Sequence, residues 1–306
     1  MNQLQYCEKN TIIHKLNPFC KLGWACSLVL LVLIFDNPVY ITTLFMVTIL
    51  LIFAAGVQRK WFSLMKIAFY LCVAIIVVNI LVNNNGTHVL LRAPFTLPVI
   101  GTPLVSLEAI CFAATMSLRL LTIMSAFAII TFTIHPDDLL LSMIKAKLPY
   151  KSVLVTSLST RFIPTLFNDI QCISDVQRSR GLELDKGNLT QKVSNRMAII
   201  VPLLSNSLDR VVQVAEAMEA RAFGSTGKRT YYKQIHFSKT DIYALLIIVF
   251  TTGFGIFVSI SGYGDYQYYP SLAPLDMSNR EILYVSILML SFLSIIPIAC
   301  LNRRSP

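Results

Sequence analysis

Long apolar stretches on both sides of a polar middle constrain this chain more than any other feature. A bilayer's hydrocarbon core is about 30 Å thick and takes about 20 residues of α-helix to cross. Hydrophobic residues make up 55% of the chain and charged residues only 14%, whereas soluble proteins carry about 25% charged residues. The apolar stretches cover 22–35, 39–57, 62–82, 104–133, 242–262 and 281–301. They predict an all-α membrane protein with about six transmembrane helices, of which the first is short.

The basic residues predict how these helices are oriented. Fifteen lysines and arginines lie between Lys145 and Lys239, and most of the others gather in alternate connections, while the opposite connections hold only Arg92 and Arg280. Cytoplasmic connections carry this excess in membrane proteins. We therefore expect a membrane region over 1–134 with a cytoplasmic N-terminus, a cytoplasmic domain over 135–240, and a second membrane region over 241–306 with a cytoplasmic C-terminus. The net charge of +10 then reflects orientation in the bilayer, and no nucleic-acid partner is expected.

Two smaller features of the membrane regions carry expectations of their own. The connection 83–103 is apolar and bracketed by turn-forming residues, which predicts a hairpin lying on the membrane surface. Arg119 falls inside the fourth apolar stretch, where a charge facing lipid is costly. Its side chain is expected to pair with a neighbouring helix or to extend to the interface.

The polar middle contains two long amphipathic helices. Apolar residues repeat every three or four positions in both, which predicts an apolar seam along each helix. The first seam contains Leu158, Phe162, Leu166, Ile170 and Ile173, and the second contains Val201, Leu204, Leu208, Val211 and Met218. Several charged residues interrupt each helix, and a charge at mid-bilayer costs about 2.5–3.5 kcal/mol. The two helices are therefore expected to be cytoplasmic.

Each of these helices ends in an arginine between small residues. The first ends in Ser179-Arg180-Gly181 and the second in Ala220-Arg221-Ala222. A guanidinium offers a rigid fork of donors for carboxylates and carbonyls, and small neighbours allow the helix end to enter a groove on a partner. The alternative is that each arginine only complements the helix dipole, an effect of about 0.3–1 kcal/mol.

The sequence lacks the patterns typical of catalysis. Its four histidines are scattered, its seven cysteines form no CxxC, and no GxSxG, HExxH or phosphate-binding GxxxxGK[ST] is present. These motifs would supply a nucleophile, a metal site or an ATP site. We therefore expect no catalytic residue, no metal site and no cofactor bound by this chain.

The pattern resembles the transmembrane coupling (T) component of energy-coupling factor (ECF) transporters. Members of that family have two cytoplasmic coupling helices that each end in an X-Arg-X motif, most often Ala-Arg-Gly, and each motif here differs from that form at one flank. Further matches are Leu16-Asn17-Pro18, Lys21-Leu22, Arg161-Phe162-Ile163-Pro164, the run from Pro202 to Arg210, and Lys228-Arg229-Thr230. Phe19 replaces the arginine that is usual in the first of these segments.

The resemblance implies a division of labour in the cell membrane of a prokaryote. Two ABC-type ATPase subunits would bind ATP and Mg²⁺, and a small membrane S component would bind a vitamin or a metal ion such as cobalt or nickel. Arg180 and Arg221, with their small flanks, would dock on the ATPases, and the two seams would contact the S component. The alternatives are the permease of a conventional ABC importer and a membrane-embedded enzyme.

Overall fold

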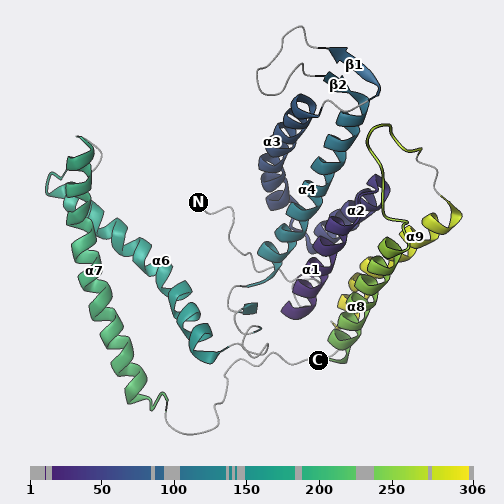
Figure 1. Cartoon of the computed structure of the whole chain (residues 1–306). Coiled ribbons are helices and arrows are strands. Elements are labelled where there is room, and N and C mark those ends of the chain that lie inside the picture. Colours follow the sequence, from purple (N-terminus) through teal and green to yellow (C-terminus); the bar gives the residue numbers. More distant parts are fainter. Residues whose placement is uncertain are drawn as a thin grey trace. The chain divides into compact units, whose positions relative to one another are not determined.

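The computed structural model divides the chain into two compact units. The first, the bundle unit, comprises 1–139 and 235–306, and the second, the two-helix unit, comprises 140–234. The predicted cytoplasmic domain 135–240 overlaps the two-helix unit, and its cytoplasmic location stays a prediction. The structure describes residues 11, 16–83, 87–92, 104–135, 138–139, 142, 149–182, 188–224, 238–274 and 278–302 (Figure 1).

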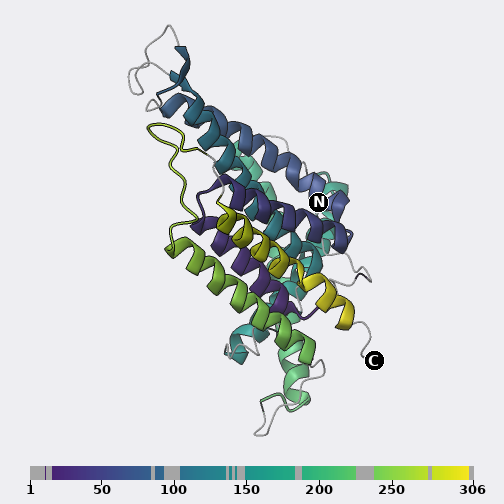
Figure 2. The ribbon, with the colours of Figure 1, turned by 90° about the vertical axis from the view of Figure 1, so that its right-hand side faces the viewer.

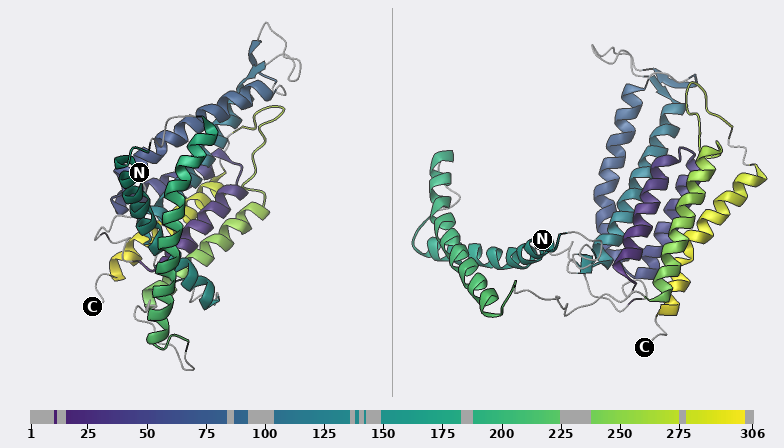
Figure 3. Two further views of the ribbon diagram at one scale, coloured as in Figure 1. Left: turned by 90° about the vertical axis from the view of Figure 1, so that its left-hand side faces the viewer. Right: turned by 60° about the horizontal axis from the view of Figure 1, so that its bottom comes forward.

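The bundle unit consists of helices that lie side by side (Figure 3). They are α1 (Pro18–Ile34), α2 (Pro38–Ala55), α3 (Gln58–Val82), α4 (Leu107–Thr133), α8 (Lys239–Ile260), α9 (Asn279–Leu293) and α10 (Ile295–Asn302). Helix α4 packs against α1, α2 and α3, while α8 packs against α1 and α9. The prediction of an all-α membrane protein is confirmed, with one short pair of strands as the exception.

Asparagine and proline begin both helices of the first hairpin. The side-chain oxygen of Asn17 accepts from the amide of Phe19 (3.2 Å), and that of Asn37 accepts from the amide of Val39 (3.0 Å). Pro18 and Pro38 occupy the first helical positions, where a missing N–H leaves no hydrogen bond unmade. Each Asn-Pro pair therefore caps a helix and starts it at a fixed residue.

Six helices in the described part of the chain are long and apolar enough to cross a membrane. Five of them coincide with predicted spans: α2, α3, α4, α8 and Asn279–Ile298. The sixth is Gln191–Ala220, which the sequence analysis assigns to the cytoplasm because of its charges, and that assignment stays a prediction. Helix α1 has 17 residues, or about 26 Å at 1.5 Å per residue, which falls short of a full span.

The short helix α1 lies at the centre of the bundle core. Leu28, Leu31 and Val32 have no exposed surface, because α4 and α8 pack on either side of the helix. Helix α3 shows the opposite pattern, with exposed apolar residues along its length such as Phe69, Tyr70 and Val78. Large exposed apolar surfaces are typical of membrane contact, so α3 is expected to face lipid along its length, whereas α1 exposes only a few apolar residues such as Leu30 and Leu33.

Arg119, near the middle of α4, pairs with the end of α1. Its Nη2 donates to a carboxylate oxygen of Asp36 (2.7 Å) and to the carbonyl of Phe35 (2.7 Å). The expected pairing with a neighbouring helix segment is therefore present. The short α1 explains it, because the turn after α1 reaches α4 only about halfway along that helix.

The part of α4 that precedes Arg119 contacts a strand pair and the connection after α8. Strand β1 (Val89–Arg92) pairs antiparallel with β2 (Leu104–Ser106) at the end of α3 and the start of α4 (Figure 2). The strand pair agrees with the predicted hairpin over 83–103, of which residues 93–103 lie outside the described part of the chain. Leu104–Ser106 form a strand, whereas the sequence predicts a helix from residue 104.

Tyr268, in the connection after α8, donates to the carbonyl of Asp36 (2.8 Å) and packs on Phe112 of α4. Burial raises the pKa of the Tyr268 hydroxyl, which remains a neutral donor.

The first turn of α1 contacts the last residue of α4 and the first turn of α8. The Nζ of Lys21 donates to the carbonyl of Thr133, the last residue of α4 (2.9 Å). The side-chain amide of Asn17 donates to the carboxylate of Asp241 in the first turn of α8 (3.3 Å). The sequence leaves the bundle unit after α4 and returns just before α8, so one helical turn holds the ends of the two helices that come before and after the two-helix unit.

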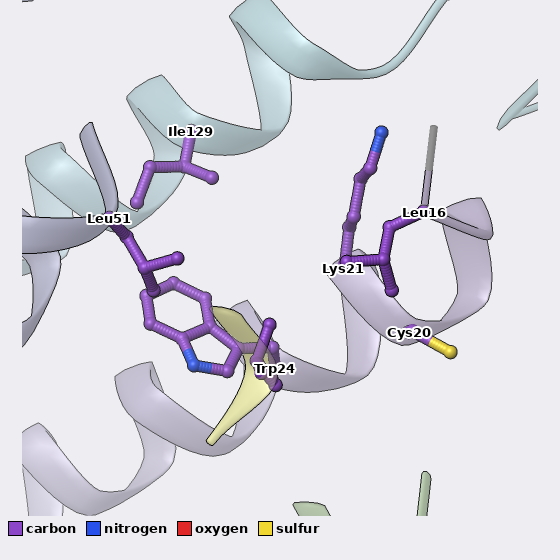
Figure 4. Close-up of a pocket in the computed structure, with 7 residues that line it drawn as sticks. Leu16, Cys20, Lys21, Trp24, Leu51 and Ile129 are labelled. Atoms are coloured by element: carbon purple, nitrogen blue, oxygen red, sulfur yellow. The ribbon is translucent and has the colours of Figure 1, made fainter. Parts of the chain in front are cut away.

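A small cavity lies beside this turn. It has a volume of about 20 Å³ and is lined by Leu16, Cys20, Lys21, Trp24, Leu51, Ile129 and Ile295 (Figure 4). A water molecule needs about 10–15 Å³ of such volume, so nothing larger than water fits. The cavity is a packing defect in the core and not a ligand site.

The contact of α1 with α8 makes one glycine essential. A Cβ at Gly255 would collide with the side chain of buried Leu31, whereas a Cβ at Gly253 would meet nothing within 4 Å. We expect Gly255→Ala to destabilise the protein by about 1–3 kcal/mol through overpacking. Gly253→Ala, on the same helix, should be neutral or stabilise it by up to about 1 kcal/mol. Thermal unfolding in detergent compares the two, and equal melting temperatures would contradict this account of the helix contact.

Candidate functional site

The two-helix unit contains α6 (Tyr150–Ser179) and α7 (Leu189–Ala220), which form an antiparallel pair. The Arg210 guanidinium of α7 contacts the Asp169 carboxylate of α6 (2.9 Å), and the Gln177 side-chain amide donates to the carbonyl of Ala198 (3.3 Å). Both helices run through an internal proline, at Pro164 and Pro202. The two predicted amphipathic helices are therefore present.

Arg180 is the residue that closes the last turn of α6. The amide of Gly181 donates to the carbonyl of Arg178 (3.0 Å), and the amide of Leu182 donates to that of Gln177 (3.0 Å). These two bonds form a Schellman motif, which satisfies the free carbonyls at a helix end. The motif requires a left-handed residue after the cap, and Gly181 has φ +83°.

Helix α7 ends in the same way at Arg221. The amide of Ala222 donates to the carbonyl of Glu219 (2.8 Å), and the amide of Phe223 donates to that of Met218 (2.9 Å). Ala222 takes the left-handed position with φ +55°. For a residue with a Cβ this conformation costs about 1–2 kcal/mol. The two X-Arg-X segments therefore have one backbone structure, with the arginine as cap and the following small residue turned left-handed.

Both arginine side chains point away from their own unit's core. Arg180 and Arg221 are exposed, and within the described parts of the chain neither has a salt bridge or a side-chain hydrogen bond. Arg178, two residues before Arg180, differs because it contacts Asp175 of the same helix (3.9 Å). The flanking residues Ser179, Gly181, Ala220 and Ala222 are also exposed. Each helix end thus presents one guanidinium on a surface of small side chains.

The two predicted seams are exposed to different extents. In α7, Val201, Leu204, Leu208 and Val211 are more than half exposed, while Met218 is half-buried. In α6, Leu158, Phe162, Leu166 and Ile173 are half-buried, and Ile170 is 36% exposed. The α7 residues that link to α6, Ala198 and Arg210, are not members of the seam. The α7 seam is therefore not used to hold the pair together.

Sequence reasoning missed two features of this unit. The small residue after each arginine is needed for left-handed backbone and not only for access, and the Gly at position 181 was the available signal. The pairing of Asp169 with Arg210 had no signal, because each was counted only as a charge that interrupts a helix. Lys228-Arg229-Thr230, which match the family pattern, lie outside the described residues.

Comparison with known proteins identifies the family of the chain. A family model described as CbiQ, cobalt transport protein, matches residues 9–232. The chain belongs to this family. Its match covers α1 to α4, both arginine-capped helices and the connections between them.

Several curated relatives of the chain are named energy-coupling factor transporter transmembrane protein EcfT. The protein of Streptococcus equi subsp. equi is 30% identical over 80% of this chain and 91% of its own length. The protein of Clostridium kluyveri is 31% identical over 79% and 90%, and that of Staphylococcus aureus is 27% identical over 80% and 92%. These relatives confirm the resemblance to ECF transporter T components, and the chain is a multi-pass membrane protein of that class.

The left-handed residue after each arginine yields a matched pair of variants. Gly181→Ala adds a Cβ to a left-handed residue and is expected to destabilise the end of α6 by about 1–2 kcal/mol. Ala222→Gly, which restores the family's usual Ala-Arg-Gly, removes that cost from α7. Hydrogen exchange of the purified chain measures both, and we expect faster exchange in the last turn of α6 and slower exchange in that of α7. Changes of the same sign in both variants would refute the assignment of these caps.

Proposed function

We propose that this chain couples ATP hydrolysis by two cytosolic ABC-type ATPase subunits to movement of a substrate-binding S component in the membrane. The observation that carries the proposal is the pair of identical helix ends, each with an exposed arginine that has no partner among the described residues. A helix dipole alone does not require a shared cap structure with small flanks. A groove on each of two similar ATPase subunits would require two similar tips.

The second step of the proposal concerns the membrane partner. The exposed face of α7, formed by Val201, Leu204, Leu208 and Val211, is apolar and is not used by α6. An apolar surface of this kind favours another apolar helix or protein. We infer that the S component packs on this face and on the α6 seam, so that a shift of the two helices reorients it.

The remaining parts of the proposal follow from the charge distribution and from the family. The excess of lysine and arginine between α4 and α8 favours a cytoplasmic two-helix unit and cytoplasmic termini in a prokaryotic cell membrane. ATP and Mg²⁺ would be bound by the ATPases, since this sequence has no phosphate-binding loop. The substrate class would be a vitamin or a metal ion, taken up through the S component.

The arginines provide the test of this proposal. The double variant Arg180→Glu with Arg221→Glu should lose the ATPases on affinity purification of the complex, because each tip would then carry the wrong charge. Loss of one buried interfacial arginine costs about 2–4 kcal/mol, which is roughly a 30- to 700-fold weaker contact. Each single variant should therefore weaken retention, and the double variant should abolish it.

Arg178→Glu is the matched control for this experiment. Arg178 has the same charge and lies on the same helix as Arg180, but its partner is Asp175 of its own helix. We expect this variant to retain both ATPases. Full retention by the double variant, or equal loss in the control, would exclude docking through the two tips.

A further inference from the structure

One ion pair joins the two helices of the two-helix unit. Arg210 Nη2 lies 2.9 Å from Asp169 Oδ2, and the two side chains are 31% and 24% exposed. The other ion pair between described residues of this unit, Asp175 with Arg178, lies within α6 at 3.9 Å and is 66% and 61% exposed. The first pair is shorter, more shielded from water and shared between helices, so it holds α6 and α7 to one another.

The position of this pair relates it to both arginine tips. Asp169 precedes Arg180 by eleven residues, and Arg210 precedes Arg221 by eleven residues. At 1.5 Å per residue, each tip lies about 16 Å along its helix from the pair. The two helices leave this common point along inclined axes, so the tips lie at separate ends of the pair (Figure 1). A change in how the helices meet there changes the spacing of the tips.

Few other polar contacts between described residues of this unit fix how the helices meet. The second contact, from Gln177 to the carbonyl of Ala198, lies eight residues from Asp169 on α6 but twelve residues from Arg210 on α7. The two contacts are thus separated by a shorter stretch of α6 than of α7, which fits two helices with inclined axes, as Figure 1 shows for this pair. Between Arg210 and Arg221, no described residue of α7 forms a hydrogen bond or ion pair with α6. The Asp169–Arg210 pair is therefore the last polar link before the second tip.

The contact between α6 and α7 does not use the apolar seam of α7, since Val201, Leu204 and Leu208 stay exposed. Packing along that seam therefore does not fix the register of the pair, and a single polar pair can select one register. Sliding α7 by one turn would separate the Arg210 guanidinium from the Asp169 carboxylate by about 5 Å more. It would leave both charges half-buried without a partner, which disfavours the shifted arrangement.

We propose that Asp169 and Arg210 are positioning residues, whose ion pair fixes the register and crossing point of α6 and α7 and thereby the spacing of Arg180 and Arg221. The first part concerns the chain alone. The consequence for the ATPases rests on the proposed function, since a fixed spacing matters only if both tips are held at the same time.

A distance measurement on the full chain tests the first part. Spin labels are placed on the exposed Cys172 of α6 and on an Ala217→Cys variant of α7, with the other cysteines replaced, and the distance distribution is measured in detergent. We expect Asp169→Arg and Arg210→Asp each to broaden the distribution or shift its maximum by about 5 Å, one helical turn. The double charge reversal should restore the original distribution, and Asp169→Glu should preserve it.

Two controls keep this test decisive. Asp175→Arg changes the same charge on the same helix in the exposed pair and should leave the distance unchanged. Asp169→Asn, which keeps size and shape, replaces the charge-reversed variants if these do not elute as folded protein, and it should still broaden the distribution. An unchanged distribution in the single variants, or a double reversal as broad as the singles, would overturn the inference.

Retention of the ATPases by the same variants, without labels, tests the consequence. Each single reversal should lower the fraction of complexes that keep both ATPase subunits at least tenfold, and the double reversal should restore it. Suppose that the distances change as expected, but that these variants and the Arg180→Glu, Arg221→Glu double variant all keep the ATPases. The proposed function then fails, while the role of the ion pair in fixing the register stands. If the Arg180→Glu, Arg221→Glu double variant loses the ATPases, but the distance between the spin labels is the same with and without the ion pair, only the inference about Asp169 and Arg210 fails.

Discussion

The first turn of α1 holds the end of α4 and the start of α8, the two helices of the bundle unit between which the two-helix unit lies in the sequence. Lys21 holds the end of α4 through the carbonyl of Thr133, and Asn17 holds the start of α8 through the carboxylate of Asp241. All four residues are buried, so water competes little for these contacts. The same helical turn therefore links the end of α4 and the start of α8 to the core of the bundle through α1. The family's Leu-Asn-Pro and Lys-Leu segments fall on this turn.

The surroundings of α1 explain why so short a helix belongs to a membrane protein. Helices α4 and α8 cover it on both sides, and the connection after α8 closes its far end through Tyr268 and Asp36. Arg119 satisfies the Phe35 carbonyl at the point where α1 stops. Because the Phe35 carbonyl and the Asp36 backbone find protein partners at this end, the short α1 ends inside the protein.

The two arginine motifs show how one short sequence can serve structure and recognition together. The left-handed residue after each arginine closes the helix through hydrogen bonds to its last carbonyls, which leaves the guanidinium free to point outward. A larger residue at that place would strain the backbone before it met any partner. Small flanks are therefore explained by the chain's own helix ends as well as by access to a groove, and Ala222 is tolerated at a cost that Gly181 avoids.

The apolar stretches, the Asn-Pro caps, the two long helices and the arginine tips were all predictable from the sequence, because each depends on residues close together along the chain. Partnerships between distant residues were not predictable. Arg119 with Asp36, Lys21 with Thr133, and Asp169 with Arg210 join segments that only the packing of helices brings together. Hydrophobic periodicity specifies that a helix has an apolar face but not which neighbour covers it. The sequence therefore determined the elements and the tips, whereas the tertiary structure decided that α1 is buried, that the α7 seam is exposed, and where α6 and α7 meet.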